Sequence, residues 1–346
     1  MPRHALVVIA LTACLSLSAV PQPALKSLMP PGARIGVALN ERQIDGVAAA
    51  LVTRHFNSIS PENVLKWESL HPARGRYAFA AADRYVAFGE RHGMEVTGHT
   101  LVWHQQVPAW VFTDPRGTRA ALKDHVKQVV GRYRGRIRGW DVVNEALDER
   151  GALRDSPWRR ALGDDYVAEA YTLAHAADPD AELYYADYNL FRPEKRAGAL
   201  RLIRDLQSRG IRIDGVGIHA HWGLDFPTKD QIRQMLADFD ALGISVMLSE
   251  LDVSVLPRRS DLNPYVQGLP REIQQKLAQR YAEIFRLALE NKTTRITLWG
   301  LDDGSSWLND YPVPGRTNHP LLWDRAYRPK PAFDAVVEVL RSFREK

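Results

Sequence analysis

Two glutamates follow apolar segments in a way that could give acid–base and nucleophilic chemistry. Glu145 follows residues 140–144 (WDVVN), and Glu250 follows residues 244–249 (ISVMLS). Continuous apolar runs of this kind are typical of strands buried in a parallel sheet. Catalytic groups of (β/α)₈ barrels lie at the carboxyl ends of such strands. Two carboxyl groups facing one pocket could cleave a glycosidic bond, although two unrelated strand-end charges would give the same pattern.

Strand-like and helix-like segments alternate along the chain and predict an α/β fold. Eight such strands favour a closed (β/α)₈ TIM barrel, a single catalytic domain, over an open doubly wound sheet. Helix starts are indicated at Asp114, Ser156 and Thr228, and helix ends at Gly210 and Gly243. No Gly-x-Gly-x-x-Gly turn follows the first strand, which weakens a dinucleotide-binding alternative. The predicted strands are residues 34–38, 57–60, 95–103, 137–144, 182–188, 215–221, 245–250 and 295–299, and the clearest helices are residues 119–133, 166–177, 193–209, 229–242 and 271–289.

The composition is that of a globular domain, with 346 residues, 45% hydrophobic and 25% charged. No linker or low-complexity tract divides the chain, so we expect the barrel to span residues 30–346, as a monomer. The net charge is +5, but the basic residues are scattered, so nucleic acid is not an expected partner. Nine tryptophans would suit stacking on the apolar faces of sugars, with ordinary core packing as the alternative.

Residues 1–24 predict an export signal. Arg3 and His4 precede the apolar run 5–17, which is too short to cross a bilayer as a helix. Two processing routes stay open: residues 11–14 (LTAC) resemble a lipoprotein box with lipid on Cys14, and a conventional peptidase could cut after Ala19 or a little later. Either route predicts an exported protein: secreted, periplasmic or anchored to the outer membrane by lipid. Cys14 is the only cysteine, so the mature domain can have no internal disulfide and no cysteine-based zinc site.

Polar residues gather at one end of the predicted strands, which predicts an active site on one barrel face. As a set, their motifs resemble those of glycoside hydrolase family 10, whose members are mostly endo-1,4-β-xylanases. The resemblance covers about residues 34–346, with motifs in the family's order and roughly its spacing. These motifs are residues 61–63 (PEN) with 66–67 (KW), 98–99 (GH) with 103–104 (WH), 140–145 (WDVVNE), 250–252 (ELD), and 299–300 (WG) with Trp307.

The resemblance implies that Glu250 is the nucleophile and Glu145 the acid/base of a retaining reaction on xylan and xylo-oligosaccharides. Such a reaction needs carboxyl groups about 5–5.5 Å apart. We expect the Glu250 anion to raise the pKa of Glu145, and its esterification to lower that pKa again. Asp252 would support the nucleophile through His221. No cofactor, metal or protein partner is implied, and the substrate-binding residues would be Glu62, Asn63, Lys66, His99, Trp103, Gln106, Asn144, Tyr188, His219, His221, Trp299 and Trp307.

By the same resemblance, Lys66 and His99 would hold the sugar beside the scissile bond. Xylose lacks the hydroxymethyl group of glucose, and Gln106 and Trp307 are our candidates for a wall that excludes this group. Two residues depart from the family pattern. His219 stands where glutamine is usual, and an imidazole can become charged near neutral pH. Ala186 stands where asparagine is usual. These departures bear on the pH optimum and on fine specificity.

Three rival functions stay open. A β-1,4-glucanase or mixed β-glycanase could use the same barrel. A surface protein could bind xylan without cleaving it, although binding alone needs neither Glu145 nor Glu250. A metallohydrolase would need a ligand set, and His104, His219 and His221 are the available cluster, but no His-Glu-x-x-His motif is present.

Overall fold

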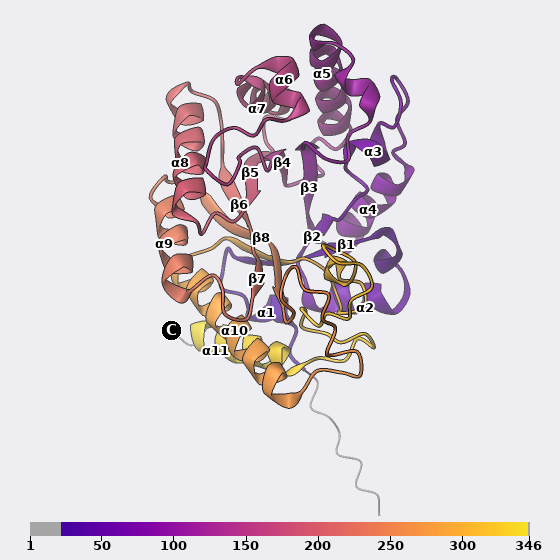
Figure 1. Ribbon diagram of the computed structural model, residues 1–346. Coiled ribbons are helices and arrows are strands. Elements are labelled where there is room, and N and C mark those ends of the chain that lie inside the picture. The colour runs from indigo at the N-terminus through magenta and orange to yellow at the C-terminus, as the bar shows by residue number, and fades with distance from the viewer. Residues whose placement is uncertain (1–21, 345–346) are drawn as a thin grey trace, which may run out of the picture.

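A closed barrel of eight parallel strands forms the centre of the computed structural model, which describes residues 22–344 (Figure 1). The strands pair in the order β1-β2-β3-β4-β5-β6-β8-β9, and β9 pairs back with β1. The short β7 pairs with the far end of β8. The TIM-barrel prediction is confirmed. The strands are β1 Arg34–Leu39, β2 Ser58–Pro61, β3 Glu95–Val102, β4 Gly139–Asn144, β5 Glu182–Tyr188, β6 Gly215–His219, β7 His221–Gly223, β8 Ser245–Ser254 and β9 Arg295–Leu298.

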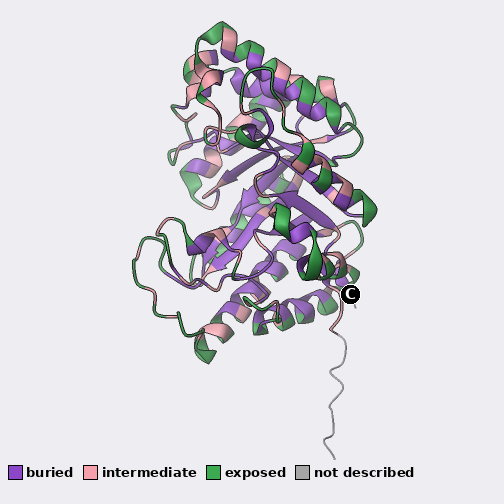
Figure 2. Ribbon diagram, turned by 90° about the vertical axis from the view of Figure 1, so that its right-hand side faces the viewer, coloured by how far each residue is buried: buried purple, intermediate pink, exposed green. Residues whose placement is uncertain are grey.

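Helices surround the barrel, and their outer faces are exposed while the strands are buried (Figure 2). Three short 3₁₀ helices lie at Glu41–Ile44, Ala109–Phe112 and Trp307–Asn309. The α-helices are α1 Leu25–Leu28, α2 Gly46–His55, α3 Trp67–Leu70, α4 Ala80–Arg91, α5 Pro115–Arg132, α6 Pro157–Leu162, α7 Tyr166–Ala177, α8 Pro193–Ser208, α9 Lys229–Asp240, α10 Arg271–Glu290 and α11 Pro331–Arg344.

The helix boundaries follow the local signals in the sequence. The side chains of Asp114, Ser156 and Thr228 each accept a hydrogen bond from a backbone N–H in the first turn of α5, α6 and α9. Such caps satisfy donors that a helix leaves free at its start. Gly210 and Gly243 follow α8 and α9 with φ of +67° and +68°, a conformation that glycine adopts without steric cost. The predicted starts and ends are therefore confirmed.

Tight packing between β3 and β4 fixes the strand that leads to Glu145. Trp140 of β4 is fully buried against Gly98 of β3. A Cβ atom on Gly98 would lie 2.2 Å from Cε3 of the Trp140 indole, so only glycine allows this contact. The two strands can then lie side by side with the large indole packed directly over Gly98.

β-Bulges interrupt both strands that carry the glutamates. Between Leu248 and Leu251, β8 has one more residue than the facing segment of β9. In β4, the register against β5 shifts in the same way between Asp141 and Val143. A bulge turns the side chains that follow it toward a new direction, and bulges are common beside active sites.

Most boundaries differ from the sequence prediction by a few residues, and three differences bear on the site or on the extent of the domain. The predicted strand 215–221 is split by Ala220 into β6 and β7. Because β8 continues to Ser254, Glu250 lies within its strand and not at the strand's end. The packed domain also begins before residue 30, since Leu25 of α1 is fully buried in the core.

The processing site and Cys14 lie outside the described residues, so the predicted signal is not visible in the structure. Among residues 22–344, no helix combines the length and the apolar character needed to cross a membrane.

Candidate active site

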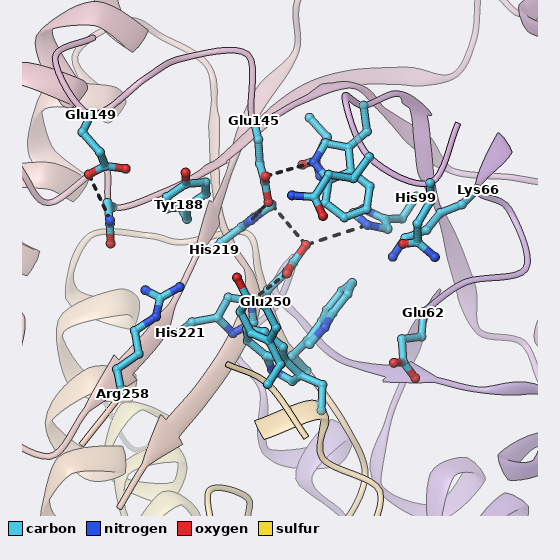
Figure 3. A pocket seen from close by; sticks show the side chains of 18 of the residues that line it. Glu62, Lys66, His99, Glu145, Glu149, Tyr188, His219, His221, Glu250 and Arg258 are labelled. Carbon is cyan, nitrogen blue, oxygen red and sulfur yellow. Dashed lines mark hydrogen bonds and ion pairs between the residues drawn. The ribbon is translucent and has the colours of Figure 1, made fainter. Parts of the chain in front are cut away.

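A cavity of about 760 Å³ lies beyond the carboxyl ends of the barrel strands, and Glu145 and Glu250 both line it (Figure 3). All the predicted substrate-binding residues line this cavity except Asn63. Asp252, predicted as a support, lies behind the cavity wall. The cavity also has lining residues that the sequence reasoning did not assign: Gln105, Glu149, Asn189, Arg192, Arg258, Arg259 and Tyr311.

Glu250 is buried and is held by histidines. Its Oε2 accepts a hydrogen bond from Nε2 of His221 at 2.8 Å, and its Oε1 lies 3.1 Å from Nε2 of His219. Nε2 of His99 lies 3.9 Å from the same oxygen. Burial alone would raise the pKa of Glu250, but electrostatic interactions with the imidazoles of His219, His221 and His99, together with the hydrogen bond from His221, lower it to about 2. Glu250 is therefore an anion at neutral pH.

Behind Glu250, a chain of hydrogen bonds fixes the orientation of His221. Nδ1 of His221 bonds to Oδ2 of Asp252 at 2.9 Å, and Nε1 of Trp307 donates to the same oxygen at 2.8 Å. Burial disfavours a charged ring, but the carboxylates of Asp252 and Glu250 outweigh it and raise the pKa of His221 to about 10. His221 then donates through both ring nitrogens, so it bridges Glu250 and Asp252 as expected.

Glu145 has a different environment. It lies one residue beyond β4 with φ of +55°, which is uncommon for a residue with a side chain. Its backbone N–H donates to the carbonyl of Ala186 at 2.8 Å, and its Oε2 accepts from Nε1 of Trp103 at 2.9 Å. Burial, aided by the carboxylate of Asp187, raises the pKa of Glu145 to about 7, against the lowering effect of the Trp103 bond. Glu145 can therefore hold a proton at neutral pH.

The expected effect of Glu250 on this pKa is confirmed in direction, but it is not the main cause of the shift. Repulsion from Glu250 contributes, but less than burial and less than Asp187. Asp187 is fully buried, with its Oδ1 2.9 Å from Nζ of Lys195 and its Oδ2 accepting from the Tyr185 hydroxyl at 2.5 Å. A carboxylate within an apolar strand was the signal available in the sequence. No feature of the sequence indicated that Lys195 of α8 would be its partner.

His219 lies between the two carboxyl groups. Its Nδ1 is 3.7 Å from Oε1 of Glu145, and its Nε2 faces Glu250 without hydrogen-bond geometry to any described group. Burial lowers the pKa of His219 to about 3. The expectation that this residue could become charged near neutral pH is therefore wrong, because the protein interior disfavours the cation.

One side of the cavity is a polar cluster of Lys66, Asn63 and Gln106. Nζ of Lys66 donates to Oδ1 of Asn63 at 3.1 Å, and Nε2 of Gln106 donates to the same oxygen at 3.3 Å. Asn63 thus holds two lining residues instead of lining the cavity itself. Nζ of Lys66 also lies 4.8 Å from the centroid of the Trp103 ring, and the carboxyl group of Glu62 has a pKa raised by burial.

Aromatic and amide groups complete the walls. The rings of His99 and Trp299 meet edge to face with centroids 5.2 Å apart, and Trp307 stacks on Tyr311 at 5.2 Å. Asn144 is buried and its Oδ1 has no hydrogen-bond partner among the described residues, so that oxygen is available to a ligand.

A metal ion could be held by one group of side chains. Among residues 22–344, ligand atoms of His219, His221 and Glu250 all lie within 4.8 Å of one another. His104, which the sequence placed with the two histidines, is not part of this group.

A (β/α)₈ barrel with one protonated and one ionised carboxyl group at its carboxyl end has the architecture of a glycoside hydrolase. Comparison with known proteins agrees. The model of glycosyl hydrolase family 10 matches residues 24–339. This chain belongs to glycosyl hydrolase family 10.

The relatives cover nearly the whole chain. Endo-1,4-beta-xylanase A of Xylanibacter ruminicola is 41% identical, over 94% of this chain and 98% of its own length. A GH10 endoxylanase retrieved from a sugarcane soil metagenome is 40% identical with a TM-score of 0.89, over 92% of this chain and all of its own. A mutant enzyme solved in complex with xylotriose is 35% identical with a TM-score of 0.88, again over 92% of this chain.

Proposed function

We propose that this protein is an endo-1,4-β-xylanase that hydrolyses internal β-1,4 bonds of xylan with retention of anomeric configuration. The observation that carries the proposal is the opposite proton affinity of two carboxyl groups in one cavity, with a pKa of about 7 for Glu145 and about 2 for Glu250. The names of the relatives and the xylotriose complex of a neighbour support xylan as the substrate.

In the first step, a carboxylate oxygen of Glu250 attacks the anomeric carbon. The bond from that carbon to the leaving oxygen breaks, and Glu145 gives its proton to the departing chain. In the second step, Glu145 takes a proton from water, the water oxygen attacks the anomeric carbon, and Glu250 leaves as a carboxylate. Glu145 ends protonated, so both groups return to their starting state.

The neighbours of each carboxyl group have roles that follow from their contacts. His221, fixed by Asp252, orients Glu250 and stabilises its charge. Trp103 donates to Glu145 and points the acid toward the leaving oxygen. Asn144 offers its free amide oxygen to a sugar hydroxyl, a bond that contributes to rate if it tightens in the transition state.

Xylose selection depends on the sugar pocket around Lys66, His99 and Trp299. Gln106 and Trp307 close this pocket where glucose would carry a hydroxymethyl group, so glucose-based chains are rejected by steric exclusion. Tyr188 lines the opposite end of the cavity, where the leaving chain would lie.

Export is part of the proposal. Residues 1–24 would direct the chain out of the cytoplasm, and the mature enzyme would act as a monomer, either free or with lipid on Cys14. Mass spectrometry of the mature N-terminus, with Cys14→Ser for comparison, distinguishes lipidation from cleavage after Ala19.

The deciding experiment compares the wild type with Glu250→Ala on unbranched β-1,4-xylan and on carboxymethyl-cellulose. Short xylo-oligosaccharides from the wild type alone, initially formed as the β-anomer, support a retaining xylanase. Faster cleavage of carboxymethyl-cellulose would favour a glucanase, and tight binding without cleavage would favour a xylan-binding protein.

A further inference from the structure

Charge is distributed unevenly along the cavity. Glu62 and Lys66 lie on one side of the glutamate pair, and Arg258, Tyr188 and Glu149 lie on the other (Figure 3). On the first side, the negative charge of Glu62 is balanced by the positive charge of Lys66. The second side carries more cations than anions, because Arg192, Arg258 and Arg259 all line it together with Glu149 alone.

Two of the cations near this second side already have partners. Nζ of Lys195 lies 2.9 Å from Asp187, and Nη1 of Arg192 lies 3.6 Å from Glu149. Arg258 and Arg259 differ, since their exposed guanidinium groups form no ion pair or hydrogen bond with residues 22–344. Two neighbouring unpaired arginines beside a substrate cavity leave several N–H donors available to a ligand.

The backbone that carries these arginines is held in place. Nη1 of the buried Arg316 donates to the carbonyl of Pro257 at 2.8 Å and to that of Ser260 at 3.3 Å. These two carbonyls flank Arg258 and Arg259 on either side. The pair therefore projects from a segment that a buried side chain clamps at both ends, and the arginines are presented at the cavity rim.

We propose that Arg258 and Arg259 bind the carboxylate of a uronic acid branch on the xylan chain. This inference rests on the proposed function. A guanidinium matches a carboxylate through two parallel hydrogen bonds, and neither a neutral branch nor the sugar backbone offers that partner. The carboxyl groups of Glu62, Glu149 and Glu250 also line the cavity, so an acidic substrate would meet repulsion there unless cations offset it.

The position defines which sugar carries the branch. The arginines lie on the side away from Lys66 and His99, so the branch would sit on the leaving part of the chain. The pair would thus select among cleavage sites along an acidic xylan, favouring bonds with a uronate just beyond the point of cleavage.

The test uses a xylo-oligosaccharide with one uronic acid branch and the same compound after reduction of its carboxyl group to an alcohol. The reduced compound keeps the shape of the acidic one but lacks the charge of its carboxylate. For the wild type we expect kcat/KM about 3- to 10-fold higher on the acidic form, falling as salt is added, as exposed charge pairs do. Arg258→Gln combined with Arg259→Gln should reduce this ratio to about one.

A matched control removes the same charge elsewhere. Arg286 and Arg341 are exposed on α10 and α11 and do not line the cavity. Arg286→Gln combined with Arg341→Gln should keep the wild-type ratio. Equal loss in this control would show general attraction by a positive protein and would overturn the proposal, as would a wild-type ratio of one.

Calorimetry separates this inference from the proposed function. The affinity of both oligosaccharides is measured with Glu250→Gln in place of the wild-type nucleophile, so the result does not depend on cleavage. If the wild type fails to cleave xylan but the acidic form still binds more tightly in an arginine-dependent way, the arginine site stands and the proposed function fails. Equal or undetectable binding of both forms overturns the arginine site.

Discussion

Glu145 and Glu250 share one cavity, the first partly buried and the second buried, yet their proton affinities differ strongly. Burial by itself raises the pKa of each carboxyl group. The difference comes from the partners. Glu250 faces three imidazoles, one of them cationic, whereas Glu145 accepts one indole N–H and feels the carboxylate of Asp187. The proposed acid and the proposed nucleophile therefore differ because of neighbours on β3, β5, β6 and β7 as much as because of the glutamates themselves.

The largest effect should follow from removing the nucleophile. Glu250→Gln keeps the shape of the side chain but cannot form the glycosyl ester, so kcat on xylan should fall by on the order of 10⁴-fold or more. Initial rates on unbranched xylan measure it. A residual rate within tenfold of the wild type would show that Glu250 is not the attacking group.

Replacing the acid should have a smaller effect that depends on the leaving group. Glu145→Gln should lower kcat on xylan by about 10²- to 10⁴-fold, since general acid catalysis contributes that much. An aryl xyloside with an acidic phenol needs no proton, so this variant should still release phenol in a rapid first phase. Equal slowing on both substrates would contradict the role of Glu145.

The pH profile should reflect the asymmetry directly. The proposed mechanism needs Glu250 ionised and Glu145 protonated, so activity should be lost when pH falls below the pKa of Glu250, about 2, and when pH rises above that of Glu145, about 7. On the alkaline side, kcat/KM should fall tenfold per pH unit. A flat profile from pH 6 to 9 would show that Glu145 is not the proton donor in the rate-limiting step.

The smallest change should come from Trp103→Phe. Losing the indole N–H removes a bond that lowers the pKa of Glu145, so the alkaline limb should move to higher pH, by about one unit for a hydrogen bond to a charged group. The acid limb belongs to Glu250 and should stay in place, which serves as the internal control. Movement toward lower pH would contradict the assigned direction.

Apolar runs, caps and glycine turns predicted the barrel, because these signals act within a few residues. The motifs likewise predicted 13 of the 20 residues that line the cavity, and they missed the seven that lie outside the motifs. The bulges in β4 and β8 were not predicted, since they depend on register against neighbouring strands. The pairing of Asp187 with Lys195 and the neutral state of His219 also escaped, because both depend on what packs around a side chain in three dimensions.

The two ends of the described chain contact each other, and this contact determines which side of the molecule an attachment at either end would occupy. α1 packs against α11, and Nη1 of Arg344 donates to the carbonyl of Ser27 at 2.9 Å. α1 leads into the amino end of β1, and α11 returns to that same side, opposite the cavity. A tether or extra module joined at either end would attach on the side opposite the cavity. The cavity would then face away from the attachment and be open to insoluble polysaccharide.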